Sequence, residues 1–464
     1  MNVSFFQELL NSIAERGRSL LEGSTGEGGT GALTDLAEAL QSGRGEASGV
    51  ALAGEILSTY RKADDAEKIA FFRFLLEAFT SDEEQITTAA KSYLKHPSPE
   101  TQAALESAVV SPRQEFFRRL NLAAGATSGI VAMRADLIRF LPQAPELAAV
   151  DSDLMHLLGS WFNRGFLVLR RIDWSTSAST LEKIIEYEAV HEIQGWDDLR
   201  RRLDPSDRRC FGFFHPSLVD EPLIFVEVAL TENIPGSIQE LLAAKEDPAG
   251  DTPTTAPTTA VFYSISNCQK GLQGISFGNF LIKQVVEDLA KEIPSLKTFV
   301  TLSPAPRFAA WLVRTTNDEP GAVDDETLEL LSDNSWAAHA ENQEHLREAL
   351  LPLAAEYFLI AKSGRGKPVD PVARFHLGNG ARLQRINWLG DKSAKGLRQS
   401  HGIMVNYLYD LKHIEANHEA YVNEGIIAVS KTVRSMLSSS SKTKTNKNRK
   451  EAEMPKNATV GADE

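Results

Sequence analysis

A glycine-rich loop between a strand and a helix is the strongest local sign of chemistry in this sequence. The β-branched and aromatic run 260–266 predicts a strand and the amphipathic run 280–293 predicts a helix, with Gly271, Gly274 and Gly278 between them. Small residues let backbone N–H groups converge, and a helix N-terminus adds partial positive charge. The loop therefore predicts an anion site suited to a pyrophosphate, with a purely structural turn as the alternative.

The same loop contains a second pattern, because residues 274–278 read Gly-Ile-Ser-Phe-Gly and match the GxSxG nucleophile elbow of α/β-hydrolases. An elbow requires the strand to run directly into the serine turn, whereas residues 267–273 intervene here. The consecutive strands predicted upstream also differ from the strand–helix alternation of a hydrolase. We therefore disfavour a nucleophilic role for Ser276.

Three further segments carry polar side chains that could do chemistry, and in the first two these lie next to residues that restrict or free the backbone. Ser303 follows a predicted strand and lies beside a Pro-Ala-Pro run, although it could instead cap the helix that follows. His376 precedes a Gly-Asn-Gly turn, which is typical of close backbone approach, although a lone histidine is most often structural. The segment 405–410 contains two tyrosines that, on their own, fit a protein core equally well.

The elements that must position these residues are of two kinds. Before residue 150, apolar residues repeat at three-to-four spacing and predict helices, with Ser98 and Pro99 as a typical helix start. Later, short apolar runs predict strands at 165–172, 210–214, 223–230, 260–266 and 298–302. The sequence thus predicts an α+β protein with a helical domain (1–159), a domain with a mostly antiparallel sheet (160–437) and a disordered tail (438–464).

Charge and cysteine content exclude several classes of protein. The 464 residues carry a formal net charge of −14, which argues against nucleic acid or an anionic membrane as a partner. Two distant cysteines, Cys210 and Cys268, fit neither a disulfide scaffold nor a zinc site. With no signal-peptide pattern, membrane-spanning run or peroxisomal ending, we expect a cytoplasmic protein.

Taken together, the segments of the second half resemble the malonyl-CoA decarboxylase family. The resemblance covers residues 160 to 437 in consistent order, and its segments include Phe262-Tyr263-Ser264-Ile265-Ser266, Gly271-Leu272-Gln273-Gly274, Leu302-Ser303-Pro304, Phe375-His376-Leu377, Arg385-Ile386-Asn387-Trp388 and Asn406-Tyr407. The spacing Gly274-x-x-x-Gly278-x-x-Leu281 also resembles the acyl-CoA pyrophosphate loop of the Gcn5-related N-acetyltransferase fold. The helical first domain fits the family by length and character only.

This resemblance implies a Gcn5-related N-acetyltransferase-like catalytic domain and a helical oligomerisation domain, with a homotetramer as the assembly. It implies conversion of malonyl-CoA to acetyl-CoA and carbon dioxide without a cofactor or metal. The family's active-site positions fall on Ser264, Ser303, His376 and Tyr409. Its CoA loop falls on Gln273, Gly274, Ile275, Ser276, Phe277, Gly278 and Asn279.

Malonyl-CoA carries its own electron sink, because the thioester carbonyl lies β to the carboxylate. The enzyme has to stabilise the enolate oxygen and protonate carbon. We expect His376 to donate that proton, since histidine titrates near neutrality, Ser303 and Ser264 to bind the carboxylate or carbonyl, and Tyr409 to orient one of them. The alternatives are an N-acyltransferase on the same fold and a non-catalytic acyl-CoA sensor, and acetyl-CoA release from malonyl-CoA alone separates all three.

Overall fold

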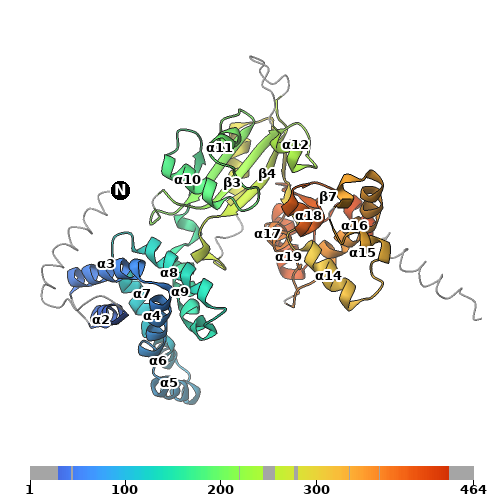
Figure 1. Ribbon diagram of the computed structural model, residues 1–464. Helices are drawn as coiled ribbons and strands as arrows, with labels where there is room; N and C mark the ends of the chain where they lie inside the picture. Colours follow the sequence, from blue (N-terminus) through green and yellow to red (C-terminus); the bar gives the residue numbers. More distant parts are fainter. Residues whose placement is uncertain are drawn as a thin grey trace, which may run out of the picture.

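A computed structural model of the protein (Figure 1) describes residues 30–42, 45–218, 220–243, 256–275, 281–333, 335–364 and 366–437. The predicted tail, 438–464, and the second half of the predicted CoA loop, 276–279, lie outside the described residues. In the described part of the chain, no helix is long and apolar enough to cross a membrane.

The N-terminal part is built from helices, as the apolar spacing predicts. They are α2 (Thr30–Gln41), α3 (Glu46–Lys62), α4 (Asp65–Ala78), α5 (Glu83–Lys95), α6 (Pro99–Val109), α7 (Pro112–Leu120), α8 (Ala126–Phe140) and α9 (Ala148–Trp161). The predicted start at Ser98 is confirmed, because its hydroxyl accepts a hydrogen bond from the Thr101 N–H at the N-terminus of α6.

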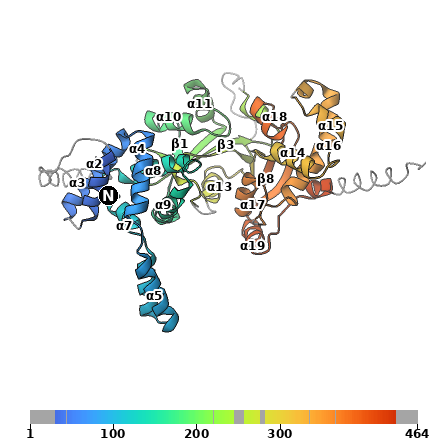
Figure 2. The same cartoon turned by 60° about the horizontal axis from the view of Figure 1, so that its bottom comes forward.

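The helices of this part differ in how far their side chains are buried. Phe72 and Leu75 of α4 are fully buried together with Phe116 of α7. In contrast, α5 and α6 contain no buried residue, and α5 projects away from the rest of the protein (Figure 2). Leu94 on this projection is 78% exposed, which leaves an apolar side chain in solvent.

The second part contains a single mixed sheet. Its strands are β1 (Val168–Ile172), β2 (Arg208–Phe214), β3 (Pro222–Thr231), β4 (Thr259–Asn267), β5 (Thr298–Thr301), β6 (Ser303–Pro304), β7 (Arg382–Asn387) and β8 (Met404–Leu408). They run in the order β1-β2-β3-β4-β5-β8-β6, with β7 also paired to β8. All described pairs are antiparallel except β4–β5. The predicted α+β class and mostly antiparallel sheet are confirmed.

Helices cover this sheet and connect its strands. They are α10 (Ala178–Tyr187), α11 (Trp196–Leu203), α12 (Ile238–Leu242), α13 (Leu281–Glu292), α14 (Phe308–Asp318), α15 (Asp325–Leu330), α16 (Ala340–Leu359), α17 (Pro371–Gly378), α18 (Ala394–Ser400) and α19 (Ile414–Glu424). The predicted helix at 280–293 corresponds to α13 and packs its apolar face in the main core. Helices α14 to α19 gather around β7 and β8 (Figure 1).

The sheet divides between β4 and β5. These two strands pair in parallel from Thr259 with Thr298 to Phe262 with Thr301, and the Leu302 N–H then donates to the Phe262 carbonyl. Beyond this point β4 continues beside β3 alone, while the chain after β5 turns to pair with β8. Strands that stop pairing inside a sheet leave backbone N–H and C=O groups free for another partner.

Candidate active site

Ser303, His376 and Tyr409 come together beside the point where the sheet divides, although they lie far apart in the sequence. Ser303 begins β6, His376 lies in α17 and Tyr409 directly follows β8. The Ser303 Oγ lies 3.1 Å from the His376 Nε2, and the His376 Nδ1 lies 2.8 Å from the Tyr409 hydroxyl oxygen. All three side chains are buried.

Local sequence fixes the position of His376. Asp370 caps α17 by accepting a hydrogen bond from the Ala373 N–H, and a proline occupies the first turn. After the helix the chain turns at Gly380, where φ is +79° and a Cβ would lie 2.0 Å from the Ile414 carbonyl oxygen. Only glycine fits there, so the close backbone approach predicted after His376 is confirmed.

The Ser303 hydroxyl is oriented by neighbouring strand residues. Its Oγ donates to the Thr301 Oγ1 at 2.9 Å, and the same Thr301 oxygen accepts from the Tyr407 N–H at 3.1 Å. Helix α14 has Arg307 as its N-cap and no side-chain cap hydrogen bond. The alternative role of Ser303 as the cap of this helix is therefore excluded.

Burial keeps the His376 imidazole neutral. Desolvation lowers the pKa of His376 to about 3, and no carboxylate in the described chain hydrogen-bonds to the ring. The Tyr407 ring stacks on the imidazole with 4.6 Å between centroids, which adds apolar surface. The expectation that this histidine titrates near neutrality is wrong, because no nearby anion offsets the lost hydration of the imidazolium.

The hydrogen bonds indicate which atoms carry protons. Burial raises the pKa of the Tyr409 phenol well above its ordinary value, so the phenol stays protonated and donates to the His376 Nδ1. A neutral imidazole has one N–H, which is then on Nε2 and donates to the Ser303 Oγ. Ser303 in turn donates to Thr301. The three neutral residues thus form a series of hydrogen bonds in which each donates to the next, from Tyr409 to His376 to Ser303.

Ser264 belongs to a different hydrogen-bonded group. It lies on β4 just after the last residue that pairs with β5, at a bulge in the β3–β4 ladder. Its Oγ lies 2.8 Å from both carboxylate oxygens of Glu188, and no hydrogen bond of the described chain joins it to His376. The structure brings three of the four predicted residues together and places the fourth beside Glu188.

The Glu188 carboxylate is held by several donors. It follows α10 and accepts hydrogen bonds from the N–H groups of Val190 and His191 at 2.8 and 2.7 Å. With the Ser264 hydroxyl, the Ser266 hydroxyl at 3.2 Å brings the donors to four. Since no cation of the described chain pairs with this carboxylate, hydroxyl and backbone donors stabilise its charge.

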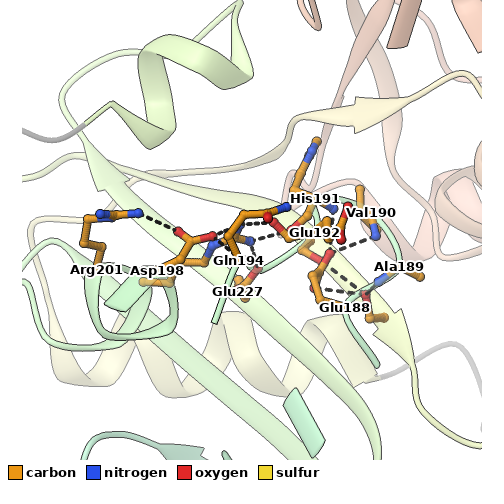
Figure 3. A network of polar contacts seen from close by, with 12 residues as sticks. Glu188, Ala189, Val190, His191, Glu192, Gln194, Asp198, Arg201 and Glu227 are labelled. Atoms are coloured by element: carbon orange, nitrogen blue, oxygen red, sulfur yellow. Dashed lines mark hydrogen bonds and ion pairs between the residues drawn. The ribbon is translucent and has the colours of Figure 1, made fainter. Parts of the chain in front are cut away.

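A second buried carboxylate lies next to this group, and Figure 3 shows the two in one network. Glu227 on β3 is fully buried and lies 3.3 Å from the Arg202 guanidinium. Burial and, after it, the charge of Glu188 raise the pKa of Glu227, and Arg202 opposes both, so that the pKa is about 8. Arg202 also donates to the carbonyl oxygens of His191 and Glu192, which secures the segment after Glu188.

The predicted CoA loop begins where the sheet domain contacts the helical domain. Gln273, Gly274 and Ile275 are described, and Gly274 has φ +84°, a left-handed conformation that favours glycine. The other predicted residues, Ser276, Phe277, Gly278 and Asn279, lie outside the described residues. Strand β4 ends at Asn267, and the 3₁₀ helix η3 (Lys270–Leu272) follows it, so a direct strand-to-serine turn of the hydrolase type is absent from this described stretch.

Sequence reasoning missed several residues of these groups. Glu188 and Arg134 were not predicted, and Thr301 and Tyr407 were seen only as parts of longer segments. Arg134 of α8 donates to the carbonyl oxygen of Gln273 at 2.9 Å. No local pattern marks Glu188 or Arg134, since each acts on a partner in a distant part of the chain.

Curated proteins similar to this chain are mitochondrial malonyl-CoA decarboxylases. The protein from Anser anser anser is 37% identical over 356 residues, which cover 71% of this chain and 70% of that protein. The protein from Rattus norvegicus is 35% identical over 410 residues, or 81% and 82% of the two chains. These relatives overturn the expectation of a cytoplasmic protein. Two buried free cysteines fit any reducing compartment, so the cysteine content could not distinguish a cytoplasmic from a mitochondrial protein.

Family and structure comparisons agree with these relatives. The malonyl-CoA decarboxylase N-terminal domain matches residues 79–162, and the malonyl-CoA decarboxylase C-terminal domain matches residues 165–447. The crystal structure of malonyl-CoA decarboxylase from Rhodopseudomonas palustris is 53% identical with a TM-score of 0.83, covering 88% of this chain and 100% of that one. The Agrobacterium vitis enzyme is 51% identical with a TM-score of 0.81, covering 87% and 99%. This chain therefore belongs to the malonyl-CoA decarboxylase family.

Proposed function

We propose that Ser303, His376 and Tyr409 form the centre at which this enzyme converts malonyl-CoA to acetyl-CoA and carbon dioxide. The observation that carries the proposal is their buried series of hydrogen bonds, 3.1 Å from Ser303 to His376 and 2.8 Å from His376 to Tyr409. Such a series offers proton donors in a site from which water is largely excluded.

The reaction needs a proton donor and an oxyanion partner. When the bond between the carboxylate carbon and C2 breaks, its electron pair enters the thioester as an enolate, and carbon dioxide leaves. The enolate then takes one proton at C2 and becomes acetyl-CoA. Because the electrons stay within the thioester, we propose that neither a metal nor an organic cofactor takes part.

We propose the neutral Nε2–H of His376 as the source of that proton. A thioester enolate is a stronger base than an imidazolate, so a neutral imidazole can protonate it, with Tyr409 supplying a proton to Nδ1. A solvent proton taken up at Nε2 as the product leaves, with return of the Nδ1 proton to Tyr409, restores the starting state. The Ser303 hydroxyl would turn from Thr301 to the thioester oxygen. Thr301 would keep its hydrogen bond from the Tyr407 N–H, so this rotation leaves no buried group without a partner.

Ser264 has a different proposed role from Ser303. Its one proton is directed to Glu188, so toward a further partner the Ser264 Oγ can act only as a hydrogen-bond acceptor. A malonyl carboxylate or thioester oxygen cannot donate to such a group, whereas an amide N–H of the pantetheine arm can. We therefore propose that Ser264 orients the arm of the substrate.

The rest of the CoA is proposed to bind along the divided sheet and at residues 273–279. The edge of β4 beyond Phe262 no longer pairs with β5, and amide groups of the pantetheine arm can pair with such an edge. The left-handed Gly274 supports an anion site for the pyrophosphate at the start of the loop.

We propose that the helical domain, residues 1–159, takes part in a homotetramer, and that the sheet domain, 160–437, carries the reaction. The projecting α5 with its exposed Leu94 supports an interface between subunits. Light scattering of the purified protein should give the mass of four chains. With a net charge of −14, nucleic acid and anionic membranes are not proposed as partners.

One assay tests the proposed reaction. Purified enzyme treated exhaustively with EDTA, without pyridoxal phosphate, biotin or thiamine, should release acetyl-CoA and carbon dioxide from malonyl-CoA in equal amounts. An N-acyltransferase would release neither product and would free CoA only when an amine acceptor was added, and a sensor would bind the ligand unchanged. Activity that disappeared with EDTA and returned with a metal would contradict the cofactor-free mechanism.

A further inference from the structure

A buried arginine of the helical domain reaches into the sheet domain. Arg134 in α8 is 2% exposed, and its Nη1 donates to the carbonyl oxygens of Gly271 at 2.7 Å and Gln273 at 2.9 Å. Its Nε lies 2.8 Å from the Asp151 carboxylate of α9. A buried guanidinium requires a counter-ion and acceptors. Among the described residues, its counter-ion is Asp151 and its backbone acceptors lie in the segment that leads into the CoA loop.

The same segment is pressed closely against the helical domain. A Cβ at Gly271 would lie 1.9 Å from the Val131 carbonyl oxygen of α8, and one at Gly274 would lie 3.7 Å from the Met155 Sδ of α9. Figure 1 shows α8 and α9 as the helices of the N-terminal part that lie next to the sheet domain. The tight contact at Gly271 leaves the chain at that position no room for a side chain and little freedom to shift.

Peptide geometry connects Arg134 with the predicted anion site. In a planar trans peptide the C=O and N–H groups point in opposite directions. By holding the Gln273 carbonyl, Arg134 therefore directs the Gly274 N–H away from the helical domain. No described residue accepts a hydrogen bond from this N–H, which leaves it fixed in direction and available to an anion.

We infer that Arg134 is a positioning residue for the acyl-CoA substrate, an inference that rests on the proposed assignment of residues 273–279 to the pyrophosphate. It fixes the Gln273–Gly274 peptide so that the Gly274 N–H meets the pyrophosphate. Asp151 neutralises the guanidinium, so Arg134 acts through this peptide rather than as a direct phosphate ligand. The helical domain is then part of the substrate site and not only an assembly module.

The chain offers a matched control in Arg113 of α7. This arginine is 6% exposed, lies 2.9 Å from the Asp153 carboxylate, and its Nη1 donates to the carbonyl oxygens of Leu76 and Phe79 at 3.2 Å. All of its partners lie within the helical domain. Loss of Arg113 therefore removes a comparable buried ion pair without touching the loop.

The experiment compares Arg134→Met with Arg113→Met on two substrates, malonyl-CoA and malonyl-pantetheine, which lacks the pyrophosphate. Arg134→Met should raise KM for malonyl-CoA about tenfold with kcat within about twofold, and should leave KM for malonyl-pantetheine unchanged. Arg113→Met should lower the melting temperature without changing either KM. Arg134→Lys, which keeps the charge and one donor, should raise KM for malonyl-CoA less than Arg134→Met does.

Equal losses with both substrates, or equal losses in the two arginine variants, would overturn the inference. Gly274→Val separates it from the proposal on which it rests. If Gly274→Val raises KM for malonyl-CoA and Arg134→Met does not, the pyrophosphate assignment stands and the role of Arg134 falls. If neither variant changes KM, the pyrophosphate assignment itself falls. Should Arg134→Met not fold, Arg134→Lys against Arg113→Lys gives the same test.

Discussion

The two polar groups beside the division of the sheet are built from opposite chemistry. The group of Ser303, His376 and Tyr409 contains only neutral hydroxyl and imidazole side chains, and burial holds the imidazole uncharged. The group of Glu188, Glu227 and Arg202 is built from acidic and basic side chains. Backbone N–H groups and serines surround the Glu188 carboxylate, and Arg202 contacts Glu227. The difference fits the separate tasks proposed above: proton transfer for the first group and orientation of the substrate arm for the second.

The largest expected effect is that of His376→Asn. If His376 protonates the enolate, kcat should fall by about 10²–10⁴-fold, with KM and the melting temperature close to wild type. An interaction used only in the transition state lowers kcat and kcat/KM together. Steady-state kinetics with thermal melts check this, and near-wild-type turnover in the folded variant would remove His376 from the mechanism.

Ser303→Ala should have the next largest effect. Removing one donor aimed at developing negative charge typically lowers kcat by about 10²–10³-fold. Because Ser303 and His376 form one series, the double variant should lose much less than the product of the two single losses. Single-turnover measurements on all three variants test this, and fully multiplicative losses would show that the two residues act independently.

Glu188→Gln tests the ionic group and should act through Ser264. The new side-chain NH₂ would donate to the Ser264 Oγ and occupy the lone pair that is proposed to accept from the substrate arm, without changing the shape of the site. We expect kcat/KM to fall about tenfold, the value of one hydrogen bond. Ser266→Ala is the control, since it removes another partner of the same carboxylate, and it should have a smaller effect. In the Ser264→Ala background, Glu188→Gln should add nothing, and a full additional loss there would contradict the proposed link.

The sequence predicts where the strands and turns of this enzyme lie better than it predicts which distant side chains come into contact. Short apolar runs are sufficient to locate β2 to β5, because a buried strand requires such residues. The turn at Gly380 is likewise recognisable, since its close contact with another chain segment excludes a side chain. The partnership of Ser264 with Glu188 is not predictable, because it depends on how α10 ends relative to β4. The sequence also does not predict that His376 is neutral, since its pKa depends on which groups surround the ring.

The smallest expected effects concern stability against pH, where the two groups should act in opposite directions. The pKa of His376 is about 3 in the folded protein and near 6.5 when unfolded, so between these values the unfolded chain binds one more proton and stability falls as pH falls. The pKa of Glu227 is about 8 when folded against an ordinary 4.5, so between 4.5 and 8 the folded chain binds one more proton and stability falls as pH rises. Each contribution approaches about 1.4 kcal/mol per pH unit.

Urea unfolding between about pH 5 and 6, the window in which both contributions operate, separates them. His376→Asn should make the loss of stability on acidification shallower, whereas Glu227→Gln should make it steeper. His191 and His401, each with a pKa lowered to about 4 by burial, act in the same direction as His376 and should keep some acid sensitivity in both variants. Because a pKa near 3 leaves His376 neutral between pH 5 and 6, kcat should show no step attributable to His376 in this range. The opposite result would be a wild-type kcat that falls with a midpoint near pH 6.5, together with a His376→Asn variant that lacks this step. It would mean that the imidazole is hydrated in the working enzyme.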